Sequence, residues 1–416
     1  MARILYSLLL YILSPIVFLH LWLRGNKAPA YRQRWGERLG FYKQPIQTNS
    51  IVIHCASVGE LMAASQLIKK LTEKHTITLT CNTPTGSAEI IKQFGNNVQH
   101  IYLPLDFPGS VKRFLNTFKP KAVVILETEL WPNLIIKSQQ AAIPVTIINA
   151  RLSEKSQRGY QKVAPLTHAM MKHISLLAAH NQTDANRFMA LGLDKAKCVV
   201  TGSIKFDIQI TQDVTRAIDK LTPQLAQHSF VWVAGSTHPG EHEQVIAAHQ
   251  ALCQNVPDAL LIIAPRHPEQ FQAVANLLAN SDLSFSQRSQ QAHQGENVLL
   301  ADTMGEMLTF FGAAHCAFIG GSLIERGGHN PLEAAAFRIP VITGVSFTNF
   351  LHVYPQLLKE EACICVNNEA ELRSQLVELS QSERKRSTLG ENAFAILEQN
   401  KGALTRTITE IENTLK

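Results

Sequence analysis

A glycine-rich segment, residues 320–333, carries the pattern that says most about chemistry in this 416-residue chain. It reads Gly-Gly-Ser-Leu-Ile-Glu-Arg-Gly-Gly-His-Asn-Pro-Leu-Glu, and it lies between the apolar residues 317–319 and the helical pattern of residues 332–337. Glycine allows tight turns and a close approach to a ligand, and free N–H groups at a helix start favour an anion. The segment therefore predicts a strand, a glycine loop and a helix that bind a phosphate.

The same segment also has a purely structural interpretation. Asn330 suits the N-cap of a helix, Pro331 its first position and Glu333 its third. A capped helix does not require the two Gly-Gly pairs, because each glycine costs chain entropy unless the backbone needs it. We therefore favour a ligand site that includes Asn330, Pro331, Leu332 and Glu333. In it, Glu333 caps the helix, accepts hydrogen bonds from a ribose, or does both.

Acidic residues follow two strand-like runs in the first half of the chain. Glu60 comes after residues 51–54 at the start of a helical pattern, where it either complements the helix dipole or takes a proton from a hydroxyl as a general base. Glu127 and Glu129 directly follow another apolar run. We expect Glu127 to accept loop N–H groups and Glu129 to position a substrate or a cation. Lys205 is the nearest candidate cation, although a solvated surface charge is the default for a lysine.

Two further loops come from the second half of the chain. Arg266 and His267 follow an apolar run and stand between two prolines. The donor fork of arginine suits a phosphate, and a buried ion pair is the alternative. Gly305, Glu306 and Met307 precede another helical pattern. Their N–H groups could hold a nucleobase edge or a phosphate, and an ordinary helix start explains the glycine equally well.

The composition excludes several classes of protein. The chain is 45% hydrophobic and 17% charged with a net charge of +6, and it has no stripe of basic residues interleaved with aromatics, so we expect no nucleic acid partner. Seven scattered cysteines form no Cys-x-x-Cys pair, which indicates reduced thiols in the cytosol. His238 and His242 are four residues apart, but Pro239 and Gly240 interrupt a metal-binding helix face. We propose no metal and no cofactor.

The N-terminus differs in kind from the rest of the chain. Residues 4–23 carry no charge, and twenty such residues are enough to cross a hydrocarbon core as a helix. One basic residue precedes them and five follow: Arg24, Lys27, Arg32, Arg34 and Arg38. This asymmetry predicts a membrane anchor with the bulk of the protein in the cytoplasm, its basic residues facing anionic lipid. A helix kinked at Pro15 in the interface, or one buried in the protein, is the alternative.

Short apolar runs alternate with helical patterns along the remainder, which predicts parallel sheets with helices on both faces. We expect strands near 51–54, 76–80, 101–103, 122–126, 145–148, 176–179, 199–201, 230–234, 260–264, 298–300, 317–319, 341–343 and 364–366. The fold class is therefore α/β, with two doubly wound domains facing a cleft. The expected divisions are an anchor at 1–25, domains at 26–210 and 229–382, a linker at 211–228, and a final helix at 383–416 that packs back on the first domain.

Several segments together resemble the Kdo transferases of lipid A assembly, which are membrane-associated glycosyltransferases of the GT-B fold. The matching segments are 34–40, 54–60, 127–133, 149–153, 201–207, 265–268 and 320–333. The resemblance implies inverting, metal-independent transfer of 3-deoxy-D-manno-oct-2-ulosonic acid (Kdo) from CMP-Kdo to a tetra-acylated lipid A precursor, lipid IVA. It also implies an inner-membrane location with the catalytic domains in the cytoplasm.

The family also implies roles for particular residues. Glu60 would be the catalytic base, and Glu129 and Lys205 would assist the transition state. The CMP site would comprise Arg266, His267, Gly305 to Met307 and Asn330 to Glu333. One departure stands out: the family has Pro-His after the glycine at 344, where this chain has Val345 and Ser346. Two alternatives are a GT-B enzyme that uses a UDP-sugar, and a membrane-tethered nucleotide-binding protein without turnover.

Overall fold

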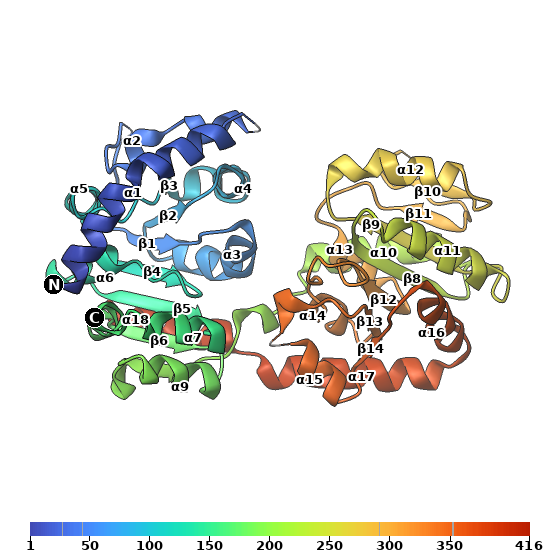
Figure 1. Ribbon diagram of the computed structural model, residues 1–416. Coiled ribbons are helices and arrows are strands. Elements are labelled where there is room, and N and C mark those ends of the chain that lie inside the picture. Colours follow the sequence, from blue (N-terminus) through green and yellow to red (C-terminus); the bar gives the residue numbers. More distant parts are fainter. Residues whose placement is uncertain (27, 44, 291, 352) are drawn as a thin grey trace. The chain divides into compact units, whose positions relative to one another are not determined.

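The computed structural model describes residues 1–26, 28–43, 45–290, 292–351 and 353–416. Lys27, one of the basic residues after the apolar segment, lies outside the described residues. The chain divides into two compact units: unit 1 comprises Met1–Lys205 with Lys401–Lys416, and unit 2 comprises Phe206–Asn400. Each unit is built around one parallel sheet with helices on both faces (Figure 1). This is the expected α/β class.

The sheet of unit 1 has the order β3-β2-β1-β4-β5-β6-β7, and all its pairs are parallel. Its strands are β1 (Ile51–His54), β2 (Ile77–Cys81), β3 (Gln99–Tyr102), β4 (Ala122–Leu126), β5 (Val145–Ala150), β6 (Leu176–Ala179) and β7 (Cys198–Val200). Val52 lies in one hydrophobic cluster and its neighbours Ile51 and Ile53 in another, so both faces of the sheet are buried. This burial explains why its strands appear in the sequence as continuous apolar runs.

Unit 2 repeats the arrangement with the order β10-β11-β9-β8-β12-β13-β14, again all parallel. Its strands are β8 (Val231–Thr237), β9 (Leu260–Pro265), β10 (Phe285–Gln287), β11 (Val298–Leu300), β12 (Cys316–Ile319), β13 (Val341–Thr343) and β14 (Cys363–Cys365). The strand β10 was not expected from the sequence. It is a three-residue edge strand that reads Phe-Ser-Gln, which is too short and too polar to give an apolar run.

Helices connect the strands of each sheet. Those of unit 1 are α1 (Ala2–Arg24), α2 (Trp35–Arg38), α3 (Val58–Thr72), α4 (Pro84–Phe94), α5 (Pro108–Phe118), α6 (Pro132–Gln140), α7 (Glu154–Gln161), α8 (Ala164–His173), α9 (Gln182–Ala190) and α18 (Ala403–Thr414). Those of unit 2 are α10 (Gln212–Leu221), α11 (His242–Cys253), α12 (Phe271–Ala279), α13 (Met307–Gly312), α14 (Leu332–Ala335), α15 (Tyr354–Lys359), α16 (Glu369–Gln381) and α17 (Glu383–Asn400).

Local sequence fixes where the helices of unit 1 begin. Pro84, Pro108 and Pro132 stand at the first positions of α4, α5 and α6, where a residue without an N–H loses no hydrogen bond. Ser57 caps α3 and Thr83 caps α4, each by accepting a backbone N–H three residues on. These caps set the positions of the loops that follow β1 and β2.

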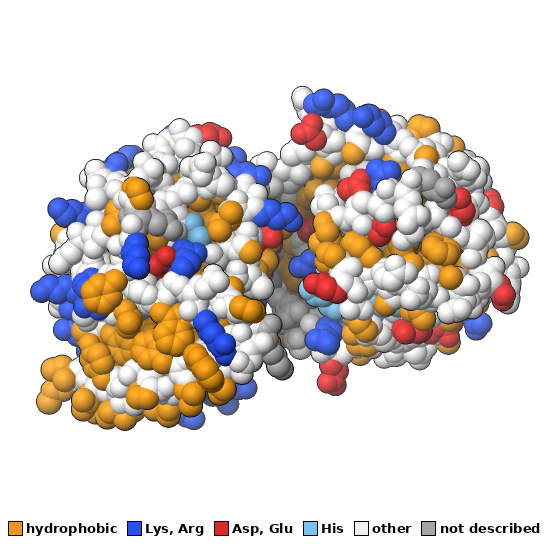
Figure 2. All heavy atoms as spheres, turned by 90° about the horizontal axis from the view of Figure 1, so that it is seen from above, with side chains coloured by type: hydrophobic (Ala, Val, Ile, Leu, Met, Phe, Trp, Pro, Cys, Tyr) orange, Lys and Arg blue, Asp and Glu red, His pale blue; other side chains and the backbone are white. Residues whose placement is uncertain are grey.

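The helix α1 continues through Pro15 from Ala2 to Arg24, with a mean hydropathy of 2.1 over its most apolar window. None of its residues is buried, which contradicts the alternative of a helix enclosed by the protein. Figure 2 shows hydrophobic side chains gathered on one face of unit 1 with Lys and Arg around them. The ring of Tyr11 stacks on Phe107 at 4.9 Å between centroids, so α1 also rests on unit 1. By length and composition, this helix could cross or anchor to a membrane.

Two segments outside the expected domains have structure of their own. The expected linker, residues 211–228, contains α10, and Leu221 and Leu225 lie in the hydrophobic core of unit 2. The expected final helix is two helices: α17 packs against α14, α15 and α16 in unit 2, whereas α18 packs against α3, β5 and β6 in unit 1. The chain therefore enters unit 1 again at residue 401.

Candidate active site

The order of strands points to one edge of the sheet in unit 1. The strand order reverses between β1 and β4, which are paired neighbours, and ligands of doubly wound sheets bind outside the carboxyl ends of strands at such a point. Glu60 stands in the loop and first turn after β1, and Glu127 and Glu129 follow β4 directly. The sequence therefore placed three carboxylates at the edge where a ligand is expected.

Glu60 is held by hydrogen bonds at both carboxylate oxygens. Its Oε2 accepts the N–H of Ala56 at 2.9 Å, and its Oε1 accepts the hydroxyl of Ser57 at 3.1 Å. The hydroxyl oxygen of Ser57 in turn accepts the N–H of Glu60 at 3.2 Å. This is a capping box at the start of α3, so the structural interpretation of Glu60 is correct as far as it goes. It fixes the carboxylate without burying it fully.

The surroundings of Glu60 raise its pKa to about 7. Burial is the largest cause because it penalises the ionised form, and the negative charges of Glu127 and Glu129 act in the same direction. The hydrogen bonds from Ala56 and Ser57 oppose the shift without cancelling it. A carboxylate whose pKa lies near neutrality is suited to accept a proton and to release it again.

Glu127 binds two cations. Its Oε2 lies 3.0 Å from Nη2 of Arg151, and its Oε1 lies 3.5 Å from Nζ of Lys205. The lysine side chain is 17% exposed and its pKa is lowered, chiefly by burial. Lys205 is therefore not the solvated surface charge that is the default for a lysine. The structure pairs it with Glu127, and the expectation that Glu129 positions a substrate or a cation stays a prediction.

The glycine segment of unit 2 differs from expectation in one respect. Its first N–H groups are not free, because the carboxylate of Glu241 accepts those of Gly321, Ser322 and Leu323 at 2.6, 2.9 and 2.9 Å. Glu241 is fully buried and also accepts the N–H of His238 at 3.2 Å. An internal carboxylate thus binds the first N–H groups of the segment, and the ligand site expected at residues 330–333 lies further along it.

Positively charged and imidazole side chains gather beside this loop instead. Nε2 of His238 lies 2.9 Å from Nε2 of His329, and the rings of His238 and His267 meet edge to face at 5.7 Å. The pKa of His238 is lowered to about 4, first by burial and then by His267, Arg326 and Arg266. The pKa of His329 is lowered to about 3 by burial and by Arg266. Both imidazoles are therefore uncharged near neutral pH, and the positive charge in this region comes from Arg266 and Arg326.

The residues expected to hold the nucleotide lie in this region of unit 2. Oδ1 of Asn330 accepts the N–H of Leu332 at 3.1 Å, and Nδ2 of Asn330 donates to Glu333 at 3.1 Å. Asn330 therefore does not form the expected N-cap: its side chain accepts the N–H two residues on, and Pro331 is the N-cap of α14, which is only four residues long. Burial raises the pKa of Glu333, and the charge of Arg266 opposes that shift.

The segment 305–307 follows β11, a strand of the same sheet, and precedes α13. Gly305 has a φ of 90°, which a residue with a side chain rarely adopts, so glycine is needed there for the turn. The carboxylate of Glu306 accepts a hydrogen bond from Arg288 at 2.9 Å. The segment is thus held by its own side chains, and its N–H groups remain candidates for a ligand.

Ser346, which replaces the histidine of the family pattern, has a structural contact. Its hydroxyl oxygen accepts the N–H of Gly327 at 3.0 Å, and its own N–H donates to the carbonyl of Ser322 at 2.9 Å. The serine therefore ties the loop after β13 to the glycine segment. In the described ranges no group of His, Cys, Asp and Glu is arranged to hold a metal ion.

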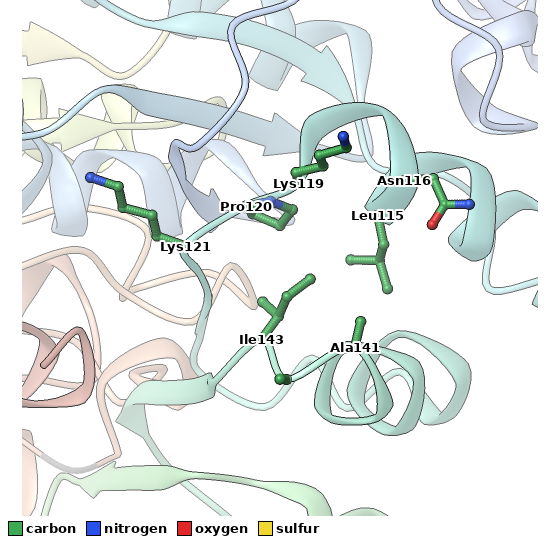
Figure 3. A pocket seen from close by; sticks show the side chains of 8 residues that line it. Leu115, Asn116, Lys119, Pro120, Lys121, Ala141 and Ile143 are labelled. Carbon is green, nitrogen blue, oxygen red and sulfur yellow. The ribbon is translucent and has the colours of Figure 1, made fainter.

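An open hollow lies at the opposite edge of the sheet in unit 1 (Figure 3). It is lined by the end of α5 and α6 and by residues that precede β4 and β5, among them Lys119, Lys121 and Ile143. Glu60 and Glu127 follow the carboxyl ends of strands, whereas this hollow precedes their amino ends. It is therefore not part of the candidate active site.

His238, Glu241 and His329 were not assigned to the site from the sequence. The signal that could have found them is the strand order, because β8 and β12 flank the point of reversal in unit 2. His238 and Glu241 come directly after β8, and His329 lies in the segment after β12. Their hydrogen-bond partners, however, could not be predicted from the sequence.

Two doubly wound parallel sheets with candidate sites at both points of strand reversal are the arrangement of the GT-B fold class. A family described as 3-deoxy-D-manno-octulosonic-acid transferase (kdotransferase) matches residues 33–208. The 3-deoxy-D-manno-octulosonic acid transferase of Haemophilus influenzae is 41% identical over 414 residues, which cover 98% of this chain and 97% of that protein. The chain therefore belongs to the Kdo transferase family, and it is a glycosyltransferase.

Other relatives and solved structures agree with this placement. The 3-deoxy-D-manno-octulosonic acid transferase of Bordetella pertussis is 30% identical, and the match covers the whole of both chains. The S. aureus MnaA–UDP co-structure has a TM-score of 0.55 with 13% identity and covers 88% of this chain and 97% of that chain. The UDP-GlcNAc 2-epimerase of Neisseria meningitidis has a TM-score of 0.52 with 13% identity, covering 87% and 99%. These two structures show the fold alone.

Proposed function

We propose that this enzyme transfers Kdo from CMP-Kdo to a tetra-acylated lipid A precursor, lipid IVA, by inverting, metal-independent glycosyl transfer. The observation that carries the mechanism is the carboxylate of Glu60, fixed by Ala56 and Ser57 at the reversal point of the sheet with its pKa raised to about 7. The names of the relatives support Kdo as the transferred group.

Residues of unit 1 act on the acceptor. Glu60 takes the proton from a hydroxyl of the acceptor, and the oxygen attacks the anomeric carbon of Kdo from the face opposite to CMP. The new carbon–oxygen bond forms as the bond to the phosphate of CMP breaks, and CMP leaves with the electron pair. Glu129 and Lys205 assist this step: Lys205 keeps a positive charge near the ionised Glu60 through its contact with Glu127.

Residues of unit 2 act on the leaving group, because negative charge develops on the departing CMP. Arg266 and His267 bind its phosphate, and the neighbouring Arg326 adds to the positive field. His238 and His329 have lowered pKa values and are uncharged near neutral pH. Preorganised charge of this kind stabilises a leaving group without a metal. Residues 305–307 and 330–333 hold the cytidine and its ribose.

The helix α1 keeps the enzyme at its lipid substrate. It carries eleven exposed large hydrophobic side chains: Ile4, Leu5, Leu8, Leu9, Tyr11, Ile12, Leu13, Ile16, Leu19, Trp22 and Leu23. We place it in the inner membrane with the catalytic units in the cytoplasm, because basic residues follow it. Not all of these basic residues can face lipid, since Arg38 is only 4% exposed. That corrects the expectation drawn from the sequence for this residue.

Incubation of the purified full-length protein with CMP-Kdo and lipid IVA, followed by mass spectrometry, tests the proposal. We expect products heavier than lipid IVA by whole Kdo residues, and CMP in equal amount. UDP-sugars supplied instead of CMP-Kdo should give no product. Transfer from a UDP-sugar, or binding of CMP-Kdo without turnover, would overturn the proposed function.

A further inference from the structure

Two arginines of unit 1 converge on the start of α4. Nη2 of Arg38 donates to the carbonyl of Asn82 at 3.0 Å, next to the N-cap Thr83. Nη1 of Arg34 donates to the hydroxyl of Ser87 at 2.9 Å, in the first turns of the helix. The N-terminus of a helix carries partial positive charge, so two guanidinium groups there are unfavourable unless negative charge is added.

The same two arginines lie over one aromatic ring. The guanidinium carbons of Arg34 and Arg38 are 4.5 and 4.3 Å from the ring centroid of Tyr102, the last residue of β3. Attraction to the face of the ring holds both side chains at the carboxyl edge of the sheet. It supplies no counter-charge.

One carboxylate, that of Glu37, lies beside the two arginines, and it already has hydrogen-bond partners. Glu37 binds Nε and Nη2 of Arg34, each at 2.8 Å, and it accepts the N–H of Tyr102 at 2.9 Å. No described carboxylate lies within ion-pair distance of Arg38, whose side chain is 4% exposed and whose pKa is lowered by burial. Its Nε lacks a hydrogen-bond partner among the described residues. A buried cation left in this state is costly.

The start of α4 also offers a backbone donor. Pro84 has no N–H, and the N–H groups of Gly86 and Ser87 bind the side chain and carbonyl of Thr83. Within the described part of the chain, these bonds leave the N–H of Thr85 open, and Thr85 is exposed. The exposed end of the cluster thus presents this N–H and the partly exposed guanidinium of Arg34. The hydroxyl of Thr85 donates to Oγ1 of Thr83 at 3.3 Å and would turn to meet a phosphate.

The cluster lies between α1 and the candidate active site within unit 1. The ring of Trp35 in α2 packs against Phe18 of α1 at 5.5 Å between centroids. On the other side, Nδ2 of Asn82 is 3.5 Å from Nε2 of His54, the last residue of β1 and the strand that leads to Glu60. The order β3-β2-β1 in Figure 1 places the ends of these strands along one edge.

We propose that the start of α4, with Arg34 and Arg38, binds a phosphate group of the lipid acceptor. This inference rests on the proposed function and adds an anchor point to it. A phosphate at Thr85 would neutralise the excess positive charge, accept the open N–H and bind the guanidinium groups. The acyl chains would then lie toward α1, and an acceptor hydroxyl toward Glu60.

The test compares two acceptors with three variants of the full-length enzyme. The acceptors are lipid IVA and the same lipid after enzymatic removal of its phosphates. Arg38→Met removes the charge, Thr85→Ala removes the exposed hydroxyl without touching the core, and Lys92→Met removes an exposed charge from the last turn of the same helix as a control. The readouts are the KM for the acceptor, the KM for CMP-Kdo and kcat.

With lipid IVA, we expect Arg38→Met to raise the acceptor KM about 10-fold or more, as the loss of a charge-assisted contact implies. Thr85→Ala should raise it less, and Lys92→Met should leave it unchanged. With the dephosphorylated lipid, the wild type should have the higher KM and Arg38→Met should add little to it. The KM for CMP-Kdo should stay the same in every variant. If Arg38→Met does not fold, Thr85→Ala makes the same comparison of the two acceptors.

Two results would overturn the site while leaving the proposed function in place. The first is an acceptor KM in the wild type that does not depend on phosphate. The second is equal effects of Arg38→Met, or of Thr85→Ala, on both acceptors. The phosphate could belong to the lipid or come free from solution, and competition by inorganic phosphate distinguishes the two. If free phosphate competes tightly and the acceptor KM does not depend on acceptor phosphorylation, the cluster binds the free ion. Absence of Kdo transfer to either lipid would instead overturn the proposed function and this site with it.

Discussion

The carboxylate of Glu241 accepts the N–H of Gly321 at 2.6 Å, although the two residues are 80 positions apart in the chain. The contact exists because β8 and β12 are neighbours in the sheet, so the loops that follow them meet. With its further bonds to Ser322 and Leu323, the carboxylate organises the start of the glycine segment. Glu241 therefore shapes the loop that leads to the nucleotide residues, and we assign it a positioning role.

Glu241→Gln tests this positioning role. The amide keeps the shape but replaces an acceptor oxygen with a donor that faces backbone N–H groups. We expect the free energy of unfolding to fall by about 2 kcal/mol or more, because buried donors lose a charged acceptor. CMP should bind more weakly as well. Urea denaturation and titration with CMP measure the two effects.

The control is Glu243→Gln, which changes an exposed carboxylate on the same helix. It should alter neither quantity. A Glu241→Gln protein that keeps the stability and CMP affinity of the wild type would show that the loop holds its shape without this carboxylate.

Glu60→Gln should lower kcat about 100-fold or more, since a positioned general base contributes at least that much to proton transfer. CMP binding should be kept, because Glu60 and the nucleotide residues belong to different units. Steady-state kinetics and CMP titration are the measurements. Glu73→Gln, at the other end of α3, is the matched control. Unchanged turnover in Glu60→Gln would remove this residue from the mechanism.

Burial decides which parts of the fold could be predicted from the sequence. Strands such as β4, buried along their whole length, gave apolar runs with the right bounds, because both faces of the sheet are covered. The edge strand β10 gave no such run. The expected cap at Asn330 was one residue early, because α14 begins at Leu332 with Pro331 as its N-cap.

Contacts between distant segments could not be predicted. The charges of residues 34–38 appeared in the sequence to be basic residues flanking a membrane segment, yet Arg38 is buried against Tyr102 and Arg34 is paired with Glu37. Likewise, the pairing of Lys205 with Glu127 depends on how β4 and the loop after β7 lie in the sheet. The types of residue were informative, but their partners required the fold.

The stability of Glu60→Gln should depend on pH in a definite direction. The raised pKa means that the folded protein holds this proton more tightly than the unfolded chain does, so ionising Glu60 between about pH 4.5 and 7 lowers stability. Replacement by glutamine removes that loss. We expect a higher Tm than the wild type above pH 7 and little difference at pH 4.5. Thermal unfolding at both pH values measures it, and an equal difference at both would contradict the raised pKa.

The pH dependence of transfer should report the same carboxylate. A general base acts in its ionised form, so kcat/KM for the acceptor should fall as the pH drops through about 7. The charge of Glu129 raises the pKa of Glu60, and Glu129→Gln should therefore move this fall to lower pH while reducing the rate. A profile of kcat/KM from pH 5 to 9, in wild type and variant, measures the shift. A fall that stays at the same pH in Glu129→Gln would mean that another group controls it.

Arg266→Ala should weaken CMP binding far more than acceptor binding. Arg266 lies near His238 and His329, whose pKa values its charge helps to lower, and we expect it to provide the donor fork for the phosphate of CMP. Loss of such contacts to a charged group implies about a 10- to 100-fold higher Kd for CMP. Calorimetric titration with CMP, and the KM for lipid IVA at saturating CMP-Kdo, separate the two effects. Arg373→Ala, an exposed arginine of α16, is the control. Equal loss of CMP and acceptor binding in a folded Arg266→Ala protein would contradict the assignment of the nucleotide to unit 2.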